Sequence, residues 1–458
     1  MGVLAARADV LKVACTCRRM RALLPLVKHW KSEGPVSVIS ERFPFLESLI
    51  LSPPPIMPAP PMDVLLSTPS PFRHLKSLSL HGWNLLRDIP QCITSAPSLE
   101  SIDLSHTAIL HIEELSNLQN LRWLDLSHSP IREIAPLAQC PSLITLDISV
   151  TRVNDISCLR KSTSLKTIRA CLLLLQLTYP VCFPQQVRHL ELCHSDAVDS
   201  IEGLRSTPRL VHLNLHFSRV SNISILSKCP RLVWLDLANT HINSLDVLQY
   251  LPNLEYLDIS GTRLTQIDIL RFCTKLKRLL IRHVPIVDIR PLRYLSNSLV
   301  SLDLDHTRVS DLAPLTNFLK LEKLEAQFCP LTDIVPLATC LQLTFIDVSH
   351  TDVTNIDALV ACRKLKYLDA SYTNIEEPPV VIEELISVRK LKFVCRAEEE
   401  TGLSLHEDRI FSDEEPEPDA ELRTVARRRW YTPFMRGFKT ACLQLVNSFR
   451  NCRGRITR

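Results

Sequence analysis

Residues 121–142 read LRWLDLSHSPIREIAPLAQCPS, and this stretch decides the fold. Three leucines in its first half fit a short strand with one buried face: Leu121, Leu124 and Leu126. Three apolar residues then follow at three-residue spacing, typical of a 3₁₀ turn that returns to the same core: Ile131, Ile134 and Leu137. One such segment is too short to bury its apolar face alone, so it must stack against copies of itself.

The pattern Leu-x-x-Leu-x-Leu recurs at spacings of 22 to 24 residues. Its copies begin at Leu75, Leu99, Leu121, Leu143, Leu165, Val187, Leu210, Leu232, Leu254, Leu276, Leu299, Leu321, Leu343 and Leu365. Degenerate copies occur around Leu49 and Leu391. We number the positions of each unit from the first residue of the pattern. This regularity predicts a solenoid in which neighbouring units share one continuous aliphatic core.

The unit length and spacing resemble the leucine-rich-repeat superfamily, nearest its short-repeat, internalin-like subclass, over about residues 75–395. The resemblance implies an α/β solenoid with short parallel strands on a concave face and 3₁₀ or short helical turns on a convex face. It implies a binding scaffold and leaves the partner open. The sequence has no P-loop, dinucleotide fingerprint, His-Glu-x-x-His motif or nucleophile elbow. We therefore expect a non-enzymatic protein without a cofactor.

The chain divides into five predicted segments. They are a helical cap or F-box-like remnant (1–40), a degenerate first repeat with a proline-rich loop (41–74), the solenoid (75–395), an acidic disordered linker (396–422) and a basic amphipathic tail (423–458). The 16 cysteines and the charged N-terminal residues favour a reducing compartment. We therefore expect a cytoplasmic or nuclear location.

Residues 8–30 contain an apolar stripe at helical spacing. The stretch is similar to the final helix of an F-box through Leu11, Cys17, Arg18, Arg19 and Leu23. In F-box proteins this module docks the linker subunit of a ubiquitin ligase, while the repeats hold the substrate. The opening Leu-Pro segment and the first helices of such a module are absent. A simple helical cap for the first repeat is the alternative, and the two interpretations are compatible.

Positions three, five and seven of each unit are predicted to project from the concave sheet. Position three carries scattered aromatic residues, and position five is mostly acidic. The predicted partner-binding residues are Trp123, Asp125, Trp234, Asp236, Tyr256, Asp258, Phe345, Asp347, Tyr367 and Asp369. Rings flanked by carboxylates suit a protein partner with a basic segment and disfavour nucleic acid on this face. The alternatives are a row of aspartates that is simply common in its slot and ring pairs that only stiffen the sheet.

Two further rows have structural interpretations. Position nine is mostly Thr or Ser, whose hydroxyls can bond to backbone, and five cysteines share one phase that indicates a small buried slot: Cys140, Cys229, Cys273, Cys340 and Cys362. A weak zinc candidate combines Cys171, Cys193 and His216, but its spacing matches no standard motif and surface packing is favoured. The two prolines at 180 and 184 predict a local kink in the stack.

The tail from residue 423 has ten Lys or Arg residues and no acid. Its candidate contact residues are Arg427, Arg428, Arg429, Arg436 and Lys439. A basic amphipathic helix could contact an anionic membrane, a nucleic acid or a partner groove, or could fold back on acidic parts of the chain. The alternative to a concave-face scaffold is therefore a membrane- or nucleic-acid-associated factor that acts through this tail.

Overall fold

The computed structural model describes residues 29–33, 46–52, 74–90, 93, 96–172, 183–195, 198–375 and 392–394. Within these ranges, strands form one 17-stranded sheet in which each strand pairs in parallel with the next along the chain. They are β1 (His29–Glu33), β2 (Ser48–Ser52), β3 (Ser77–Ser79), β4 (Ser101–Asp103), β5 (Trp123–Asp125), β6 (Thr145–Asp147), β7 (Thr167–Arg169), β8 (His189–Glu191), β9 (His212–Asn214), β10 (Trp234–Asp236), β11 (Tyr256–Asp258), β12 (Arg278–Leu280), β13 (Ser301–Asp303), β14 (Lys323–Glu325), β15 (Phe345–Asp347), β16 (Tyr367–Asp369) and β17 (Lys392–Val394).

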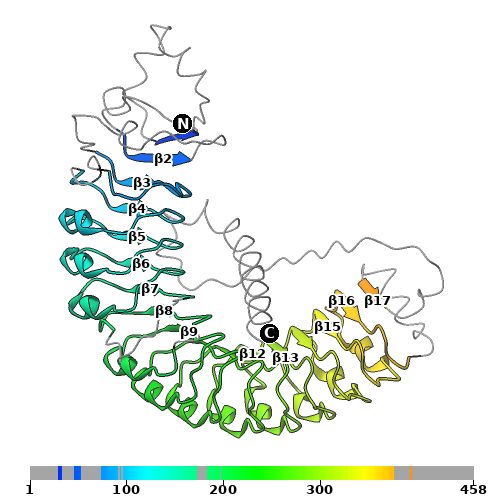
Figure 1. Cartoon of the computed structure of the whole chain (residues 1–458). Helices are drawn as coiled ribbons and strands as arrows, with labels where there is room; N and C mark the ends of the chain where they lie inside the picture. Colours follow the sequence, from blue (N-terminus) through cyan, green and yellow to red (C-terminus); the bar gives the residue numbers. More distant parts are fainter. Residues whose placement is uncertain are drawn as a thin grey trace, which may run out of the picture. The chain divides into compact units, whose positions relative to one another are not determined.

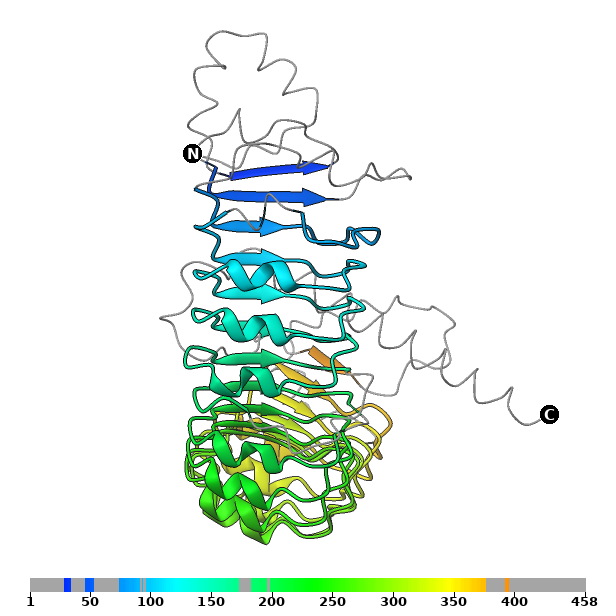
Figure 2. The same ribbon diagram turned by 60° about the vertical axis from the view of Figure 1, so that its left-hand side comes forward.

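Short 3₁₀ helices form most of the return segments, as the three-residue spacing predicts. They are η2 (Glu113–Asn117), η3 (Ala135–Gln139), η4 (Ser157–Lys161), η5 (Glu202–Ser206), η6 (Ser224–Lys228), η7 (Asp246–Tyr250), η8 (Asp268–Phe272), η9 (Arg290–Leu295), η10 (Ala313–Leu315), η11 (Val335–Thr339) and η12 (Asp357–Ala361). Figures 1 and 2 show the strands stacked along the inner side of a curved solenoid and the 3₁₀ helices along its outer side.

The core lies between these two layers and runs without a break from Leu46 to Ala370. In the repeat at residues 121–142, the three strand leucines and the three return residues are at most 2% exposed. The five cysteines of common phase are also buried, at 0% to 3% exposed. Four of their thiols donate hydrogen bonds to carbonyl oxygens of the preceding unit, for example Cys340 Sγ to Leu315 O at 3.3 Å. The apolar residues of the repeat and the five cysteines therefore pack the core, as predicted.

Each strand ends in a tight turn that repeats from unit to unit. The residue at position eight has a positive φ, between 52° and 57° wherever it is not glycine. Its N–H bonds to a carbonyl of the next unit, as from His306 N to Gln327 O at 2.8 Å. In seven units the hydroxyl at position nine closes the turn by donating to the carbonyl three residues earlier, as from Thr240 Oγ1 to Leu237 O at 2.6 Å. The Thr and Ser row is thus structural, as expected.

The ends of the solenoid differ in part from the prediction. Residues 29–33 form β1, although they fall within the segment predicted as a helical cap, because they extend the parallel sheet beyond β2. The two degenerate copies are confirmed as β2 and β17. Four predicted features lie outside the described residues: the F-box-like residues 11–23, the acidic linker, the basic tail and the segment 173–182. The sheet itself continues from β7 to β8 in register. No helix that the structure describes is long and apolar enough to cross a membrane.

Candidate partner-binding face

Four rings at position three form a row along the concave face across β8–β11, and the last three of them stack. His189 and His212 lie 5.7 Å apart between ring centroids, His212 and Trp234 lie 3.9 Å apart, and Trp234 and Tyr256 lie 4.6 Å apart. Burial lowers the pKa of His212 to about 3, so this imidazole is neutral and extends the indole surface. Trp234 and Tyr256 remain partly exposed. The predicted pairing of these two residues is confirmed, within a longer stack that their spacing alone did not indicate.

Asp236 and Asp258 lie opposite each other on β10 and β11, two residues after the stacked rings. Each Oδ1 accepts a backbone hydrogen bond, from Ala238 N at 2.9 Å and from Ser260 N at 2.8 Å. Burial, and then the charge of Asp236, raise the pKa of Asp258 to about 6. Among the described residues, neither carboxylate forms an ion pair with Lys or Arg, and His216 Nδ1 lies 3.8 Å from Asp236 Oδ1. A cation bound here would relieve the repulsion between the two carboxylates.

A second aromatic pair lies on β15 and β16, and the carboxylates beside it already have hydrogen-bond partners. Phe345 and Tyr367 stack at 4.5 Å, and Lys323 Nζ lies 4.9 Å from the Phe345 ring centroid. Asp347 Oδ2 accepts a bond from Gln327 Nε2 at 2.6 Å. Asp369 Oδ2 accepts one from the Tyr367 hydroxyl at 3.1 Å. The geometry therefore distinguishes two blocks that look equivalent in the sequence.

The first predicted pair, on β5, is isolated from both aromatic blocks. Trp123 lies between Ser101 and Thr145 on the neighbouring strands. Asp125 bonds to Ser127 N at 2.8 Å. Burial, and then the adjacent carboxylate of Asp147, raise its pKa to about 7. This pair offers an indole without a ring on either neighbouring strand.

The acidic row at position five has a structural role in these turns. In eight units its Oδ1 accepts the backbone N–H of the residue two positions later, at 2.8 Å to 3.1 Å. Such bonds fix the start of the tight turn. An aspartate in this slot is therefore explained by local geometry, whatever else the row contacts.

Positions five and seven both change at β12: Leu280 replaces the acid at position five, and Arg282 occupies position seven. The Arg282 guanidinium pairs with Asp303, with Glu325 at 3.2 Å and with Asp305 at 3.9 Å. The Asp303 side chain is only 2% exposed, whereas that of Arg282 is 43% exposed. Burial, followed by the charges of Asp305 and Glu325, raises the pKa of Asp303 to about 8. In the sequence, only the unusual residues Leu280 and Arg282 at positions five and seven indicate this cluster.

The weak zinc candidate gains no support from the geometry. Cys171 and Cys193 are buried and contact each other, and their hydrogen bond, together with burial, raises the pKa of Cys171 well above the usual range. Such thiols do not readily become the thiolates that bind zinc. Within the described ranges, no group of three or more His, Cys, Asp or Glu side chains is placed to hold a metal ion.

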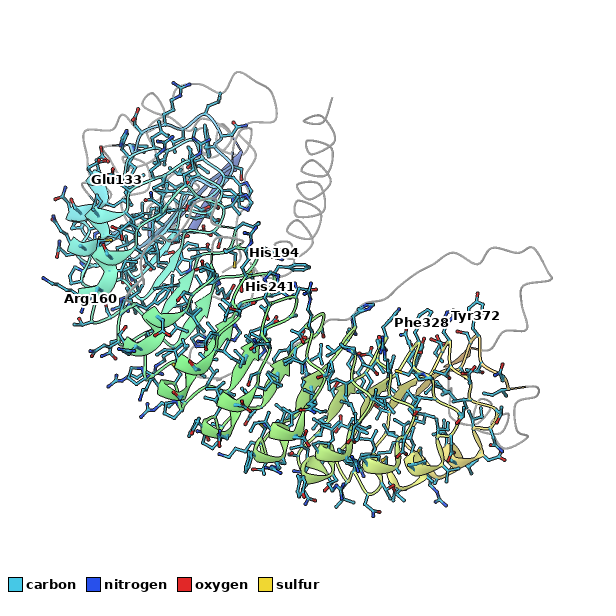
Figure 3. All side chains as sticks on the ribbon, turned by 60° about the horizontal axis from the view of Figure 1, so that its bottom comes forward. Glu133, Arg160, His194, His241, Phe328 and Tyr372 are labelled. Carbon is cyan, nitrogen blue, oxygen red and sulfur yellow. The ribbon has the colours of Figure 1, made fainter. Side chains whose placement is uncertain are left out.

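Position eight forms a second aromatic row that our sequence interpretation missed. His283, His306, Phe328, His350 and Tyr372 stack in turn, with adjacent ring centroids 4.1 Å to 4.3 Å apart. Figure 3 shows Phe328 and Tyr372 on the same edge of the solenoid, and His350 stacks between them. Their 22-residue spacing was a signal in the sequence, but the row contains too many other residue types to stand out.

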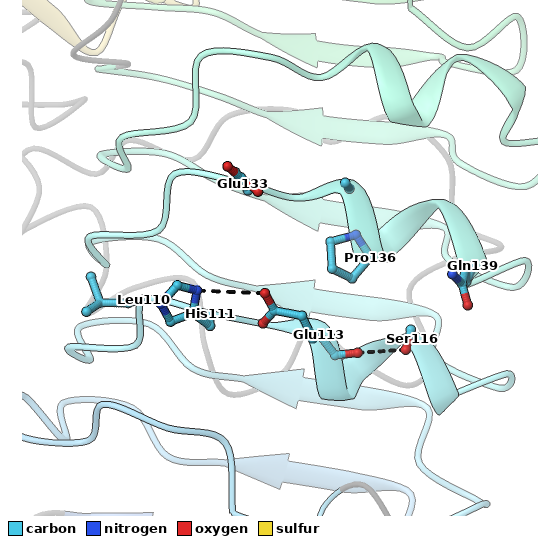
Figure 4. A pocket seen from close by; sticks show the side chains of 8 residues that line it. Leu110, His111, Glu113, Ser116, Glu133, Pro136 and Gln139 are labelled. Atoms are coloured by element: carbon cyan, nitrogen blue, oxygen red, sulfur yellow. Dashed lines mark hydrogen bonds and ion pairs between the residues drawn. The ribbon is translucent and has the colours of Figure 1, made fainter.

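The convex side has an open pocket of about 390 Å³ between η2 and η3 (Figure 4). His111 Nδ1 lies 3.7 Å from Glu113 Oε1, and Ser116 Oγ donates to the carbonyl of Glu113 at 2.6 Å. His111 and Ser116 thus both interact with Glu113. Neighbouring units repeat this backbone with other side chains, so the hollow follows from the repeat itself. We therefore assign the pocket no function.

Family models agree with the repeat pattern. One described as "Leucine Rich repeats (2 copies)" matches residues 119–161 and 230–271, and one described as "Leucine rich repeat" matches residues 73–131. No curated protein matches the sequence. Among solved structures, a leucine-rich-repeat protein of Leptospira interrogans superposes with a TM-score of 0.59 at 16% identity, covering 85% of this chain and 100% of that one. The fold is a leucine-rich-repeat solenoid.

Other leucine-rich-repeat solenoids align similarly. The functional domain of InlJ from Listeria monocytogenes, which includes a cysteine ladder, has a TM-score of 0.56 at 17% identity and covers 77% of this chain and 70% of that one. The ectodomain of the Arabidopsis thaliana receptor kinase GASSHO1/SCHENGEN3, in complex with CASPARIAN STRIP INTEGRITY FACTOR 2, has a TM-score of 0.61 at 17% identity. That match covers 80% of this chain and 46% of the other. At these identities the likeness concerns the fold.

Proposed function

We propose that this solenoid is a non-enzymatic scaffold that binds an extended basic segment of a partner protein on its concave face. The observation that carries the proposal is the Trp234–Tyr256 stack beside two facing carboxylates that lack a Lys or Arg ion pair among the described residues. An arginine or lysine of the partner would pair with the carboxylates, and its aliphatic stem would pack beside the exposed parts of the two stacked rings. The receptor-kinase ectodomain in complex with its factor is a precedent for ligand binding by the fold.

Replacing Trp234 and Tyr256 together with alanine is expected to reduce partner recovery at least tenfold, because central aromatic residues dominate the binding energy of such interfaces. The measurement is a quantitative pull-down from cell lysate with the full-length chain, read by mass spectrometry. The matched control replaces Phe345 and Tyr367, which stack in the same way but lie beside satisfied carboxylates. Equal loss of the same partners in both variants, or in neither, contradicts the assignment to β10 and β11.

The partner's chemistry is tested on the proteins that depend on Trp234 and Tyr256. Their bound segments are mapped by cross-linking, and Lys and Arg within them are replaced by glutamine. Recovery should fall after these substitutions, and it should fall for Asp258→Asn in the solenoid, because the same charge pairs are removed. Unchanged recovery in both experiments would leave a concave-face scaffold whose partner is not basic.

A role as the substrate-recruiting adaptor of a ubiquitin ligase is a narrower proposal, which rests on the F-box-like residues of the N-terminal stretch. Aspartate at both Leu11 and Leu23 would place charge on the apolar side of that predicted helix. The expected result is loss of ligase linker and cullin subunits from the pull-down, with the concave-face partners retained. Absence of ligase components from the unaltered protein would reject the adaptor role. Separately, we propose a cytoplasmic or nuclear location, because the 16 cysteines and the charged N-terminal residues favour a reducing compartment.

The second candidate function is association with an anionic membrane or nucleic acid through the tail. It is favoured by ten Lys or Arg residues and no acid after residue 422. Tail-driven binding should weaken steeply with salt and should disappear when Arg427, Arg428 and Arg429 become glutamine. Concave-face binding should survive that change.

A further inference from the structure

The rim at the carboxyl ends of the strands differs in composition from the concave face. We define the rim strip as positions eight and ten of the eight units that begin at Leu210 through Leu365. Position eight holds Phe217, Asn239, Gly261, His283, His306, Phe328, His350 and Tyr372, and position ten holds Arg219, His241, Arg263, Pro285, Arg308, Pro330, Asp352 and Asn374. These sixteen positions include three arginines, four histidines and one carboxylate. The strip is thus aromatic and cationic, whereas position five of the concave face is acidic.

The rings of the strip present their edges to solvent. Phe328 lies face to face with His306 at 4.3 Å and with His350 at 4.1 Å, so neighbouring rings cover both of its faces. It is nevertheless 46% exposed. Ring edges carry the positive part of the aromatic quadrupole, which attracts anionic groups. His283, His306 and His350 add imidazole nitrogens to the same exposed surface.

The backbone of this row makes large side chains costly. A left-handed conformation costs an L-residue roughly 1–2 kcal/mol, and asparagine and glycine tolerate it best. Asn239 and Gly261 occupy the same turn in two units, so the fold accepts these cheaper residues. Stacking offsets part of the cost for Phe328 and Tyr372, at about 0.5–1.5 kcal/mol a pair. Exposed aromatic residues in a strained conformation are typical of ligand-contacting positions.

The arginines of the strip are placed to contact carboxylates. Arg263 and Arg308 are exposed and follow β11 and β13, two strands apart. Two strand spacings correspond to ~10 Å, close to the ~9.3 Å between residues three apart in an extended polyproline-type segment. Arginine binds carboxylates through two parallel hydrogen bonds. Asp352, farther along the strip, is its single carboxylate.

We propose that the rim strip binds an extended acidic segment of a protein, with carboxylates on Arg263 and Arg308 and on the ring edges around Phe328. Charge complementarity identifies this occupant. Single-stranded nucleic acid fits less well, because its bases need free ring faces and the faces of Phe328 are occupied by its neighbours. The site is separate from the Trp234–Tyr256 site and does not depend on the function proposed for it.

The test measures fluorescence anisotropy of labelled deca-glutamate and labelled deca-uridylate probes with the full-length chain. All ten Lys and Arg residues of 423–458 are replaced by glutamine throughout, so that the tail does not bind the probes. Replacing Arg263 and Arg308 with glutamine should weaken deca-glutamate binding at least fivefold. The matched control replaces Arg160 and Lys161, two exposed cations of η4 on the convex side, and should change the affinity less than twofold. An equal effect of the two pairs overturns the proposal.

A second variant, Phe328→Asn, separates binding from folding. Asparagine tolerates the positive φ, so the melting temperature should stay within about a degree of the parent while deca-glutamate binding weakens at least twofold. Unchanged binding would reject the contribution of the ring edges and with it the proposal as stated. Tighter binding of deca-uridylate than of deca-glutamate, lost with Arg263 and Arg308, would replace the acidic protein segment by nucleic acid.

Discussion

Arg282→Met should destabilise the solenoid by about 2 kcal/mol at pH 8.5 and by clearly less at pH 5. Loss of one partner from a buried ion pair costs ~3–5 kcal/mol, and the partial exposure of Arg282 reduces this figure. The pKa of Asp303 is raised to about 8, so its protonated form contributes stability at low pH that is lost as the pH rises through that value. The Arg282 guanidinium lowers the pKa of Asp303. Its removal raises that pKa further, so more stability is lost as the pH rises. Urea denaturation followed by circular dichroism at both pH values measures the effect.

The double variant Arg282→Met with Asp303→Asn provides the control for this prediction. Removing the buried carboxylate together with its partner should recover at least half of the lost stability at pH 8.5, because an uncompensated charge is no longer buried. The difference between the two pH values should also shrink. A single variant that is equally destabilised at both pH values would show that packing of the arginine side chain, and not charge, is responsible.

Gly261→Val should destabilise the solenoid by about 2–3 kcal/mol at any pH. Gly261 has a φ of 67°, and a Cβ atom added there would lie 2.3 Å from Asn239 Oδ1. Valine therefore meets both the backbone cost of ~1–2 kcal/mol and a steric clash. The measurement is the shift of the urea midpoint relative to the parent chain.

Adding Asn239→Gly to Gly261→Val separates these two causes, because glycine tolerates the positive φ of position 239. Loss of the Asn239 side chain removes the clash but leaves valine at 261 in the left-handed conformation, so the double variant should recover only part of the stability. Full recovery would mean that the backbone conformation costs nothing in this turn. No recovery would mean that the Asn239 side chain moves aside freely in the single variant. The whole loss of stability would then come from the positive φ of residue 261.

The fold could be predicted from the sequence because one period controls every unit. The apolar phase of residues 121–142 places six side chains in the core, and the structure buries all of them. Repetition of that phase then fixes parallel pairing and in-register strands. The prediction failed at residues 29–33, which form β1. These residues lie before the first recognisable copy of the pattern, and only the open edge of β2 explains their strand conformation.

The candidate site could be predicted less completely, because periodicity gives the face of a side chain but not its contacts. The sequence placed Trp234 beside Tyr256, and the ring contact is confirmed. It could not show that Asp347 and Asp369 already have side-chain partners while Asp236 and Asp258 form no ion pair with a described Lys or Arg. Nor could it show that the aspartate row caps the turns, since that role depends on backbone amides two residues away.

Every hydrogen bond between strands of this sheet joins one unit to the next, so a force applied along the stack acts on every link and the extension is divided among many short links in series. The solenoid can therefore bend or extend by small changes between neighbouring units, without unfolding any one of them. A partner seated across several units would stiffen that part of the solenoid. Its binding could then be detected as a change in compliance when the ends of the solenoid are pulled apart in a single-molecule experiment.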